Sequence, residues 1–157
     1  MAGISTAYDG IEVIRASDLL MALSLRAAHP EARVLAGGTD LMVEMELGHN
    51  VPGLVLDIWG VDELRGVCED ETHLYIGALS THTEIQSSPV VQEHAPSLAE
   101  ATRTVGALQI QNRGTLGGNI ANASPAGDTL PVLLSLDAEV ELSSSARGRR
   151  RVGIEYL

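Results

Sequence analysis

Apolar and polar positions in the first third of the chain alternate between the spacing of amphipathic helices and that of short buried strands. In order, they predict a helix, a strand, a second helix and a second strand over 18–29, 32–36, 39–47 and 53–58. Ser17 is the predicted N-cap of the first helix and Pro30 its stop signal. We interpret residues 1–58 as a small β-α-β-α-β lobe that ends with the strand 53–58.

The rest of the chain, residues 59–157, predicts a second lobe of mixed helices and strands. Strand-like segments that flank an acidic turn predict an antiparallel hairpin, and serine and threonine caps predict two short helices after it. The predicted segments are a hairpin over 64–68 and 73–78, helices capped by Ser80 or Thr81 and by Ser87-Ser88-Pro89, a helix over 96–105, a compact apolar segment over 129–136, and strands over 138–142 and 149–156. The two lobes predict an α+β protein.

The first of two glycine turns separates the predicted strand 32–36 from the helix 39–47 and reads Ala36-Gly-Gly-Thr-Asp40. A helix that begins directly after a strand presents its first free backbone N–H groups, and the positive end of its dipole, at the mouth of the strand. Such a turn can bind a phosphate, although a Gly-Gly pair after a strand is more often a plain tight turn.

The second glycine turn lies in the stretch 109–128, which concentrates glycines and uncharged hydrogen-bonding side chains. Gly114, Gly117 and Gly118 can adopt positive φ at no steric cost. We expect them to turn successive N–H groups toward one point, which would form an anion nest. Further polar groups in this stretch are the donors Thr115, Asn119, Asn122 and Ser124 and the acceptor Asp128, which suits sugar hydroxyls.

Two such turns in one small protein predict a diphosphate bound by neutral backbone donors. Neither turn carries the Gly-Lys-Ser or Gly-Lys-Thr of a Walker loop, and neither is the Gly-x-Gly-x-x-Gly dinucleotide fingerprint. Their absence argues against a P-loop ATPase and against an ordinary Rossmann domain. The remaining interpretation is a nucleotide-containing cofactor bound by another fold.

Charge and cysteine content narrow the class of protein further. The 157 residues include 10 basic and 21 acidic side chains, a formal net charge of −11, which argues against binding of nucleic acid or anionic membranes. The basic run 147–151 is interpreted as a solvated turn and edge strand. We interpret the single Cys68 as a small core residue. The sequence also lacks a leader and an apolar run of about 18 residues, and these features together predict a cytoplasmic protein.

No group of side chains has the spacing of a catalytic or metal centre. The five histidines are scattered, and we expect them at the surface or at an interface. Asp57 and Asp62-Glu63 could form paired carboxylates, but Trp59-Gly60 between them favours a turn. No nucleophile elbow is present either. We therefore assign no catalytic residue and no metal site.

Four segments together carry a family resemblance: Ala36–Asp40, Ile76–Ala78, Gln109–Asn119 and Ala123–Asp128. They resemble the FAD-binding (medium, or flavoprotein) subunit of molybdenum hydroxylases, as in carbon monoxide dehydrogenase and xanthine dehydrogenase. The resemblance covers nearly the whole chain in the same order. It implies the α+β, PCMH-type FAD-binding fold of the molybdopterin dehydrogenases, shared more distantly with vanillyl-alcohol-oxidase-type flavoenzymes. Because members of the family continue further, it also implies that the second lobe is incomplete at Leu157.

The resemblance implies which residues contact the cofactor. Both glycine turns are expected on the FAD diphosphate, with Asp128 near ribose or ribityl hydroxyls and the segment 122–124 near the flavin side chain. The implied cofactor-binding residues are Ala36, Gly37, Gly38, Thr39, Asp40, Leu41, Thr115, Gly117, Gly118, Asn119, Ala123, Ser124 and Asp128.

The function that the resemblance implies is electron transfer. A large subunit with molybdopterin would oxidise the substrate, a small subunit with [2Fe-2S] clusters would relay electrons, and this flavoprotein would pass them to NAD, oxygen or a quinone-like acceptor. In such a hetero-oligomer the reactive atoms belong to the cofactor, which agrees with the lack of a catalytic constellation. The alternative is a truncated, non-catalytic scaffold or interaction module with residual nucleotide affinity.

Overall fold

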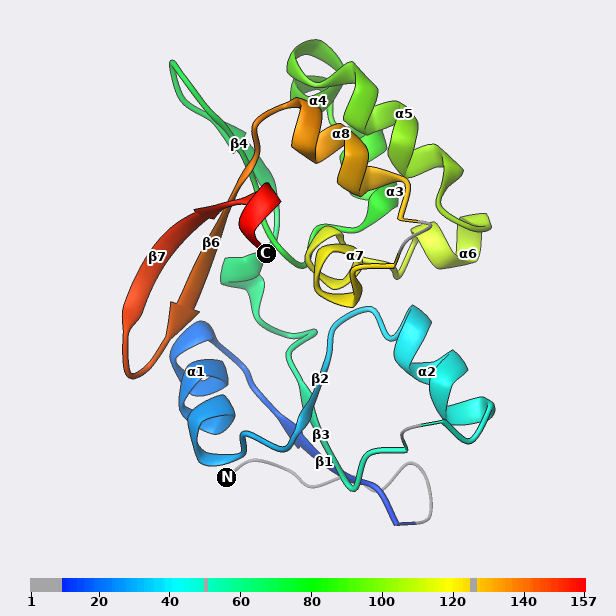
Figure 1. The fold of residues 1–157 in the computed structure, drawn as a ribbon, viewed down its shortest axis with the longest axis vertical. Coiled ribbons are helices and arrows are strands. Elements are labelled where there is room, and N and C mark those ends of the chain that lie inside the picture. Colours follow the sequence, from blue (N-terminus) through cyan, green and yellow to red (C-terminus); the bar gives the residue numbers. More distant parts are fainter. Residues whose placement is uncertain (1–9, 50, 125–126) are drawn as a thin grey trace. The chain divides into compact units, whose positions relative to one another are not determined.

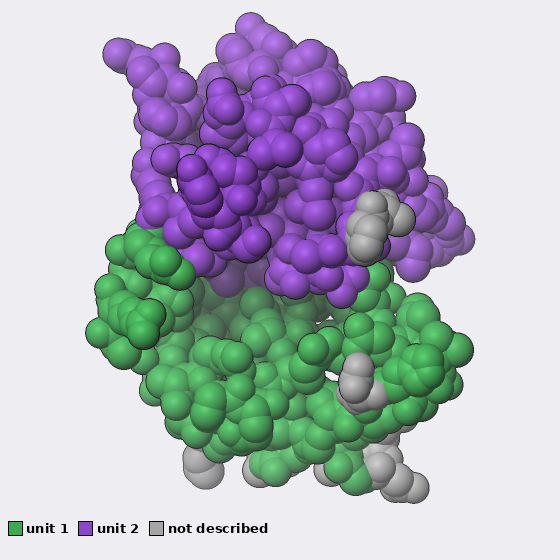
Figure 2. Space-filling model, in the orientation of Figure 1, with its two compact units in different colours: residues 1–63, 143–150 green, residues 64–142, 151–157 purple. Residues whose placement is uncertain are grey.

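The structure, a computed structural model, describes residues 10–49, 51–124 and 127–157 (Figure 1). The described residues form two compact units, one within 1–63 and 143–150 and the other within 64–142 and 151–157 (Figure 2). Helices and strands occur in both units, so the predicted α+β class is confirmed. The lobe boundary after residue 58 stays a prediction.

The first unit contains a three-stranded parallel sheet in the order β1-β3-β2. Its strands are β1 (Glu12–Arg15), β2 (Arg33–Leu35) and β3 (Leu54–Asp57), joined through the helices α1 (Leu19–Ala28) and α2 (Thr39–Glu46). The register pairs Val13 with Val55 and Val34 with Leu56. Val55 and Leu56 are buried because β3 is the central strand, which explains its continuous apolar run. The predicted β-α-β-α-β order is confirmed.

Helix α1 begins one residue later than predicted, because Asp18 and not Ser17 is its N-cap. The Asp18 carboxylate accepts a hydrogen bond from the Met21 backbone N–H at 2.8 Å, while the Ser17 hydroxyl donates to its other oxygen at 3.0 Å. These hydrogen bonds, that from Met21 above all, lower the pKa of Asp18. A carboxylate accepts more strongly than a hydroxyl, which accounts for the choice of cap.

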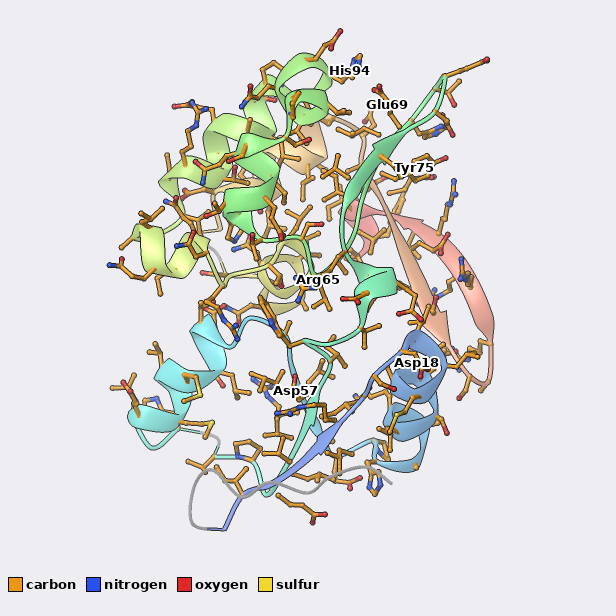
Figure 3. The ribbon with its side chains drawn as sticks, turned by 180° about the vertical axis from the view of Figure 1, so that it is seen from behind. Asp18, Asp57, Arg65, Glu69, Tyr75 and His94 are labelled. Atoms are coloured by element: carbon orange, nitrogen blue, oxygen red, sulfur yellow. The ribbon has the colours of Figure 1, made fainter. Side chains whose placement is uncertain are left out.

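The buried carboxylate of Asp57 fixes the end of the central strand (Figure 3). It accepts from Arg15 Nε at 2.8 Å and from the Trp59 backbone N–H at 2.9 Å. Residues 59 and 60 form a turn, as predicted. The contacts of Asp57 are thus those of a structural residue at a strand end.

The second unit contains a hairpin and a set of short helices around one apolar core. The elements are β4 (Val67–Glu69), β5 (Leu74–Ile76), α3 (His82–Ser87), α4 (Pro89–His94), α5 (Pro96–Thr104), α6 (Leu108–Gln111), α7 (Leu116–Asn122) and α8 (Thr129–Ser135). The antiparallel pairing of β4 with β5 confirms the predicted hairpin. The core consists of Ile85, Val91, Ala95, Leu98, Ala99, Leu116 and Leu133.

The caps of α3 and α4 agree with the sequence. Thr81 Oγ1 accepts from the Glu84 N–H at 3.2 Å, and the Glu84 carboxylate accepts from the Thr81 N–H at 2.7 Å, so the two residues form a capping box. Ser88 caps α4 through the Val91 N–H, with Pro89 as the first helical residue.

The last elements form a two-stranded sheet, β6 (Glu139–Ser144) with β7 (Gly148–Gly153), followed by the 3-10 helix η2 (Ile154–Tyr156); a further 3-10 turn, η1, spans Asp62–Leu64. The strand predicted over 149–156 is therefore wrong beyond residue 153. The Ile154 N–H donates to the Ala138 carbonyl at 2.9 Å, and its side chain packs on the core, which turns the chain out of the strand. The exposed edge strand predicted for 147–151 is confirmed.

For two side chains, the predicted burial or exposure is wrong. Cys68 is exposed, because its neighbour Val67 packs on the core and successive strand residues point to opposite faces. His82, expected at the surface or at an interface, is only 1% exposed in the first turn of α3. Within the described ranges, no helix has the length and apolar character needed to cross a membrane.

Candidate functional site

The first glycine turn joins the end of β2 to the start of α2 (Figure 1). Gly38 is the N-cap of α2 and adopts the left-handed conformation, with φ 81° and ψ 2°. A Cβ at this position would also lie 3.0 Å from Leu35 Cδ1. The turn requires glycine here because L side chains rarely adopt this φ.

Several backbone N–H groups at the start of α2 have no acceptor among the residues that the structure describes. Gly38 has no side chain to cap the helix, and the first helical hydrogen bond runs from the Met42 N–H to the Gly38 carbonyl at 2.9 Å. None of the residues that the structure describes accepts a hydrogen bond from the N–H groups of residues 38–41. Together with the positive end of the helix dipole, these donors suit an anionic ligand.

The second glycine turn has a different backbone from the one predicted. Thr115 is the N-cap of α7, and Gly117 and Gly118 lie inside this helix. The glycines with positive φ in the described chain are at positions 10, 38, 48, 66, 106 and 148, so the prediction for Gly114, Gly117 and Gly118 is wrong.

Each N–H group at the start of α7 is used within the protein. Leu116 donates to the Ser80 carbonyl at 3.0 Å, and Gly117 donates to the Ala78 carbonyl at 2.9 Å. Gly118 donates to Thr115 Oγ1 at 3.1 Å, and the N–H of Asn119 to the Thr115 carbonyl at 2.9 Å. The predicted anion nest is therefore wrong, because these donors are not available to a ligand.

The glycines of the second turn serve close packing. A Cβ on Gly117 would lie 2.7 Å from the Ala78 carbonyl oxygen and 2.8 Å from the Ala78 Cβ. A Cβ on Gly114 would lie 3.0 Å from both the His82 ring and the Ile110 carbonyl oxygen. The start of α7 can thus lie against the segment 78–82 only because these positions have no side chain.

Ala78 and Ser80 are the partners that sequence reasoning missed. Their carbonyls accept the hydrogen bonds that hold α7. The signal in the sequence is the segment Ile76-Gly-Ala78, which is part of the family resemblance and ends in two small residues. Gly77 itself has no room for a Cβ, which would overlap the Leu64 carbonyl oxygen.

The polar side chains after the second turn are arranged around the start of α8. Asn119 is half-buried, and its Oδ1 accepts a short hydrogen bond, 2.5 Å, from the hydroxyl of Thr129. Asp128 is exposed, and one of its carboxylate oxygens accepts from Thr104 Oγ1 at 3.1 Å. Asp128 thus keeps an acceptor oxygen facing solvent, as a residue that binds hydroxyls requires.

The segment between α7 and α8 includes a left-handed residue that is not glycine. Ala123 has φ 48° and ψ 38° and ends α7. Such a conformation costs about 1 kcal/mol for an L residue. Asn122 and Ala123 are exposed and Ser124 is half-buried, whereas residues 125 and 126 lie outside the described part of the chain.

The clearest shift of a carboxyl pKa lies at the turn of the β4–β5 hairpin, not in the glycine turns (Figure 3). The pKa of Asp70 is lowered by hydrogen bonds from the Thr72 backbone, the Tyr75 hydroxyl at 2.8 Å and the His73 backbone. The same bond raises the pKa of Tyr75. The shift is explained by the turn itself. In the part of the chain that the structure describes, no three acidic, histidine or cysteine side chains gather to hold a metal ion.

Comparison with known proteins gives one consistent family. Residues 8–157 match the model of the FAD binding domain in molybdopterin dehydrogenase. The chain is 41% identical over 119 residues to the nicotinate dehydrogenase FAD-subunit of Eubacterium barkeri, which covers 76% of this chain and 40% of the relative. It is 38% identical over 147 residues to the caffeine dehydrogenase subunit beta of Pseudomonas sp. strain CBB1, with 92% and 48% covered.

The fold is shared with a solved enzyme. The structure of carbon monoxide dehydrogenase from Hydrogenophaga pseudoflava, in a form that lacks the Mo-pyranopterin moiety, matches with a TM-score of 0.88 and 34% identity, over 92% of this chain and 50% of that one. The chain spans about half the length of the curated relatives it matches. From the match over residues 8–157, the chain belongs to the family of FAD-binding domains in molybdopterin dehydrogenases, as its motifs predicted.

Proposed function

We propose that this chain is the FAD-binding electron-transfer component of a molybdenum-hydroxylase-type oxidoreductase, and that the start of α2 binds the diphosphate of FAD. One observation carries the proposal: no described residue accepts from the N–H groups of residues 38–41. A diphosphate offers the negative charge and the acceptor oxygens that these donors lack. The family model, and the naming of a relative as an FAD-subunit, support FAD as the cofactor.

The residues of the first turn fit this group. Ala36, Gly37 and Gly38 are small enough for a phosphate to approach the backbone closely, and Thr39 adds a hydroxyl. The Asp40 carboxylate is exposed, and because it would repel a phosphate we assign it to a sugar hydroxyl. Leu41 is buried in the core of the first unit, which fixes the helix, and contributes its N–H alone.

For the second unit we propose contacts with the same cofactor from Thr115, Gly117, Gly118, Asn119, Ala123, Ser124 and Asp128. The sequence resemblance and the family match support them. Because the N–H groups of residues 116–119 already have acceptors, polar contacts here come from side chains, such as the Asn119 amide and the Asp128 carboxylate. The two turns then bind FAD with different chemical groups.

When bound, FAD supplies a ring that takes up electrons and passes them to NAD, oxygen or a quinone-like acceptor. The chain's own residues bind and orient it. The electrons come from a [2Fe-2S] small subunit that serves a molybdopterin-containing large subunit, so the protein acts in a hetero-oligomer. Relatives named as a subunit beta and a medium chain of dehydrogenases support this assembly. The net charge of −11 suits a protein partner better than nucleic acid.

Titration of the purified chain with FAD, ADP and riboflavin tests the proposal. FAD and ADP share the diphosphate and should bind, whereas riboflavin lacks it and should bind at least about tenfold more weakly. Gly38→Ala should lower the affinity for FAD and ADP by about tenfold, equal to about 1.4 kcal/mol. Calorimetry measures the binding of all three ligands, and flavin fluorescence measures that of FAD and riboflavin.

Gly48→Ala is the matched control. Gly48 follows α2, has φ 70°, and has open space where a Cβ would lie. Both alanines carry a similar backbone strain of about 1 kcal/mol, but only Gly38 adjoins the open N–H groups. Equal FAD affinity in the two variants would refute the assigned site. A folded chain that takes up no FAD would instead support the non-catalytic scaffold.

A further inference from the structure

Thr129 has a buried hydroxyl in contact with one of the proposed cofactor-binding residues. It is the first residue of α8, it is 0% exposed, and its hydroxyl donates to Asn119 Oδ1. The sequence did not single it out, because it begins an apolar run. The contact joins α7 to α8 through two polar side chains, while Leu116 of α7 and Leu133 of α8 belong to the apolar core.

The hydrogen bond fixes which way the Asn119 amide points. An asparagine amide has an acceptor oxygen on one side and a two-hydrogen donor on the other. Because the Thr129 hydroxyl donates to the oxygen, the Nδ2 group is directed elsewhere, and no described residue accepts from it. Thr129 is fully buried, so loss of this bond would leave a polar group unsatisfied.

The backbone of the second turn cannot supply donors, since the N–H groups of residues 116–119 already have acceptors. The amide of Asn119 is therefore a donor that this turn keeps for a ligand. Resting on the function proposed above, we propose that Thr129 is a positioning residue: its hydroxyl holds Asn119 so that Nδ2 donates to an oxygen of FAD. That oxygen belongs either to the ADP half or to the riboflavin half.

FAD and ADP affinities of Thr129 variants test the inference. Thr129→Val keeps the shape of the side chain and removes the donor, and should weaken FAD binding about tenfold. Thr129→Ser restores the hydroxyl and should bind within about twofold of the wild type. Denaturation without ligand, measured on each variant, separates a folding defect from a loss of affinity.

Thr102→Val is the matched control, because Thr102 is also 0% exposed in the second unit but its hydroxyl donates to the Ala99 carbonyl at 2.9 Å. It should bind FAD as the wild type does. The decisive comparison is between the FAD affinity of the single variant Asn119→Ala and that of the double variant Asn119→Ala/Thr129→Val. If Thr129 acts through Asn119, the second change causes no further loss of affinity, whereas a merely structural role adds its own loss.

The outcomes are distinct. A parallel loss of ADP affinity places the oxygen in the ADP half, and a loss for FAD alone places it in the riboflavin half; both support the inference. Wild-type affinity in a folded Thr129→Val protein, or additive losses in the double variant, would overturn the positioning role and leave the proposed function standing. A wild-type chain that takes up no FAD would overturn the two together.

Discussion

The two glycine turns of this chain look alike in sequence but differ in backbone conformation and in whether their N–H groups have acceptors. In the first, Gly38 adopts positive φ, and the N–H groups of residues 38–41 have no described acceptor. In the second, Gly117 and Gly118 are helical, and the N–H groups of residues 116–119 are all used. Glycine thus serves a backbone conformation in one turn and close packing in the other.

Under the proposed function, this difference gives the two turns different roles in binding the cofactor. The start of α2 offers backbone donors and a helix dipole, which suit a charged diphosphate. The start of α7 is held to residues 78–80 and offers the side chains of Asn119 and, further along, Asp128. Under the proposed function, the first turn would determine affinity for the phosphates, and the second would supply side-chain contacts whose direction depends on the packing around them.

The largest effect should come from filling the packed turn. Gly117→Ala places a Cβ against the Ala78 carbonyl and side chain, which must move, and should destabilise the free protein by about 3 kcal/mol. Urea denaturation without ligand measures it. Gly53→Ala is the control, because a Cβ there meets nothing within 4 Å, and its change should stay within about 0.5 kcal/mol. Equal stability of the two variants would mean that Gly117 is not a packing residue.

A smaller effect should follow from removing the cap of α7. Thr115→Val deletes the acceptor of the Gly118 N–H and should cost about 1 kcal/mol of stability, whereas Thr115→Ser should restore most of it. Thermal unfolding of the free protein is the measurement. If the Gly118 N–H were instead kept for FAD, Thr115→Val would leave the free protein as stable as the wild type.

Much of the fold could be predicted from the sequence, because it rests on local signals. The order of strands and helices in the first unit follows from apolar spacing, and the capping box at Thr81 and Glu84 follows from residue types three apart. The exposure of Cys68 could not be predicted in this way. Which face of a three-residue strand is buried depends on tertiary packing.

The candidate site shows the same limit. Gly38 and the start of α2 could be predicted, because strand, glycine and helix are consecutive in sequence. The backbone of Gly117 could not, because the contacts that exclude its Cβ come from Ala78, distant in sequence. Thr129 was missed for a related reason: a threonine at the head of an apolar run gives no sign that its hydroxyl meets Asn119 ten residues earlier.

Site-resolved amide hydrogen exchange, measured by NMR with and without ADP, tests the difference between the turns most directly. Without ligand, the amides of Thr39 and Asp40 should exchange quickly, and ADP should protect them. The amides of Gly117 and Gly118 should be protected already and change little when ADP is added. Slow exchange at Thr39 and Asp40 in the free protein, or protection by ADP at Gly117 and Gly118 alone, would contradict the account.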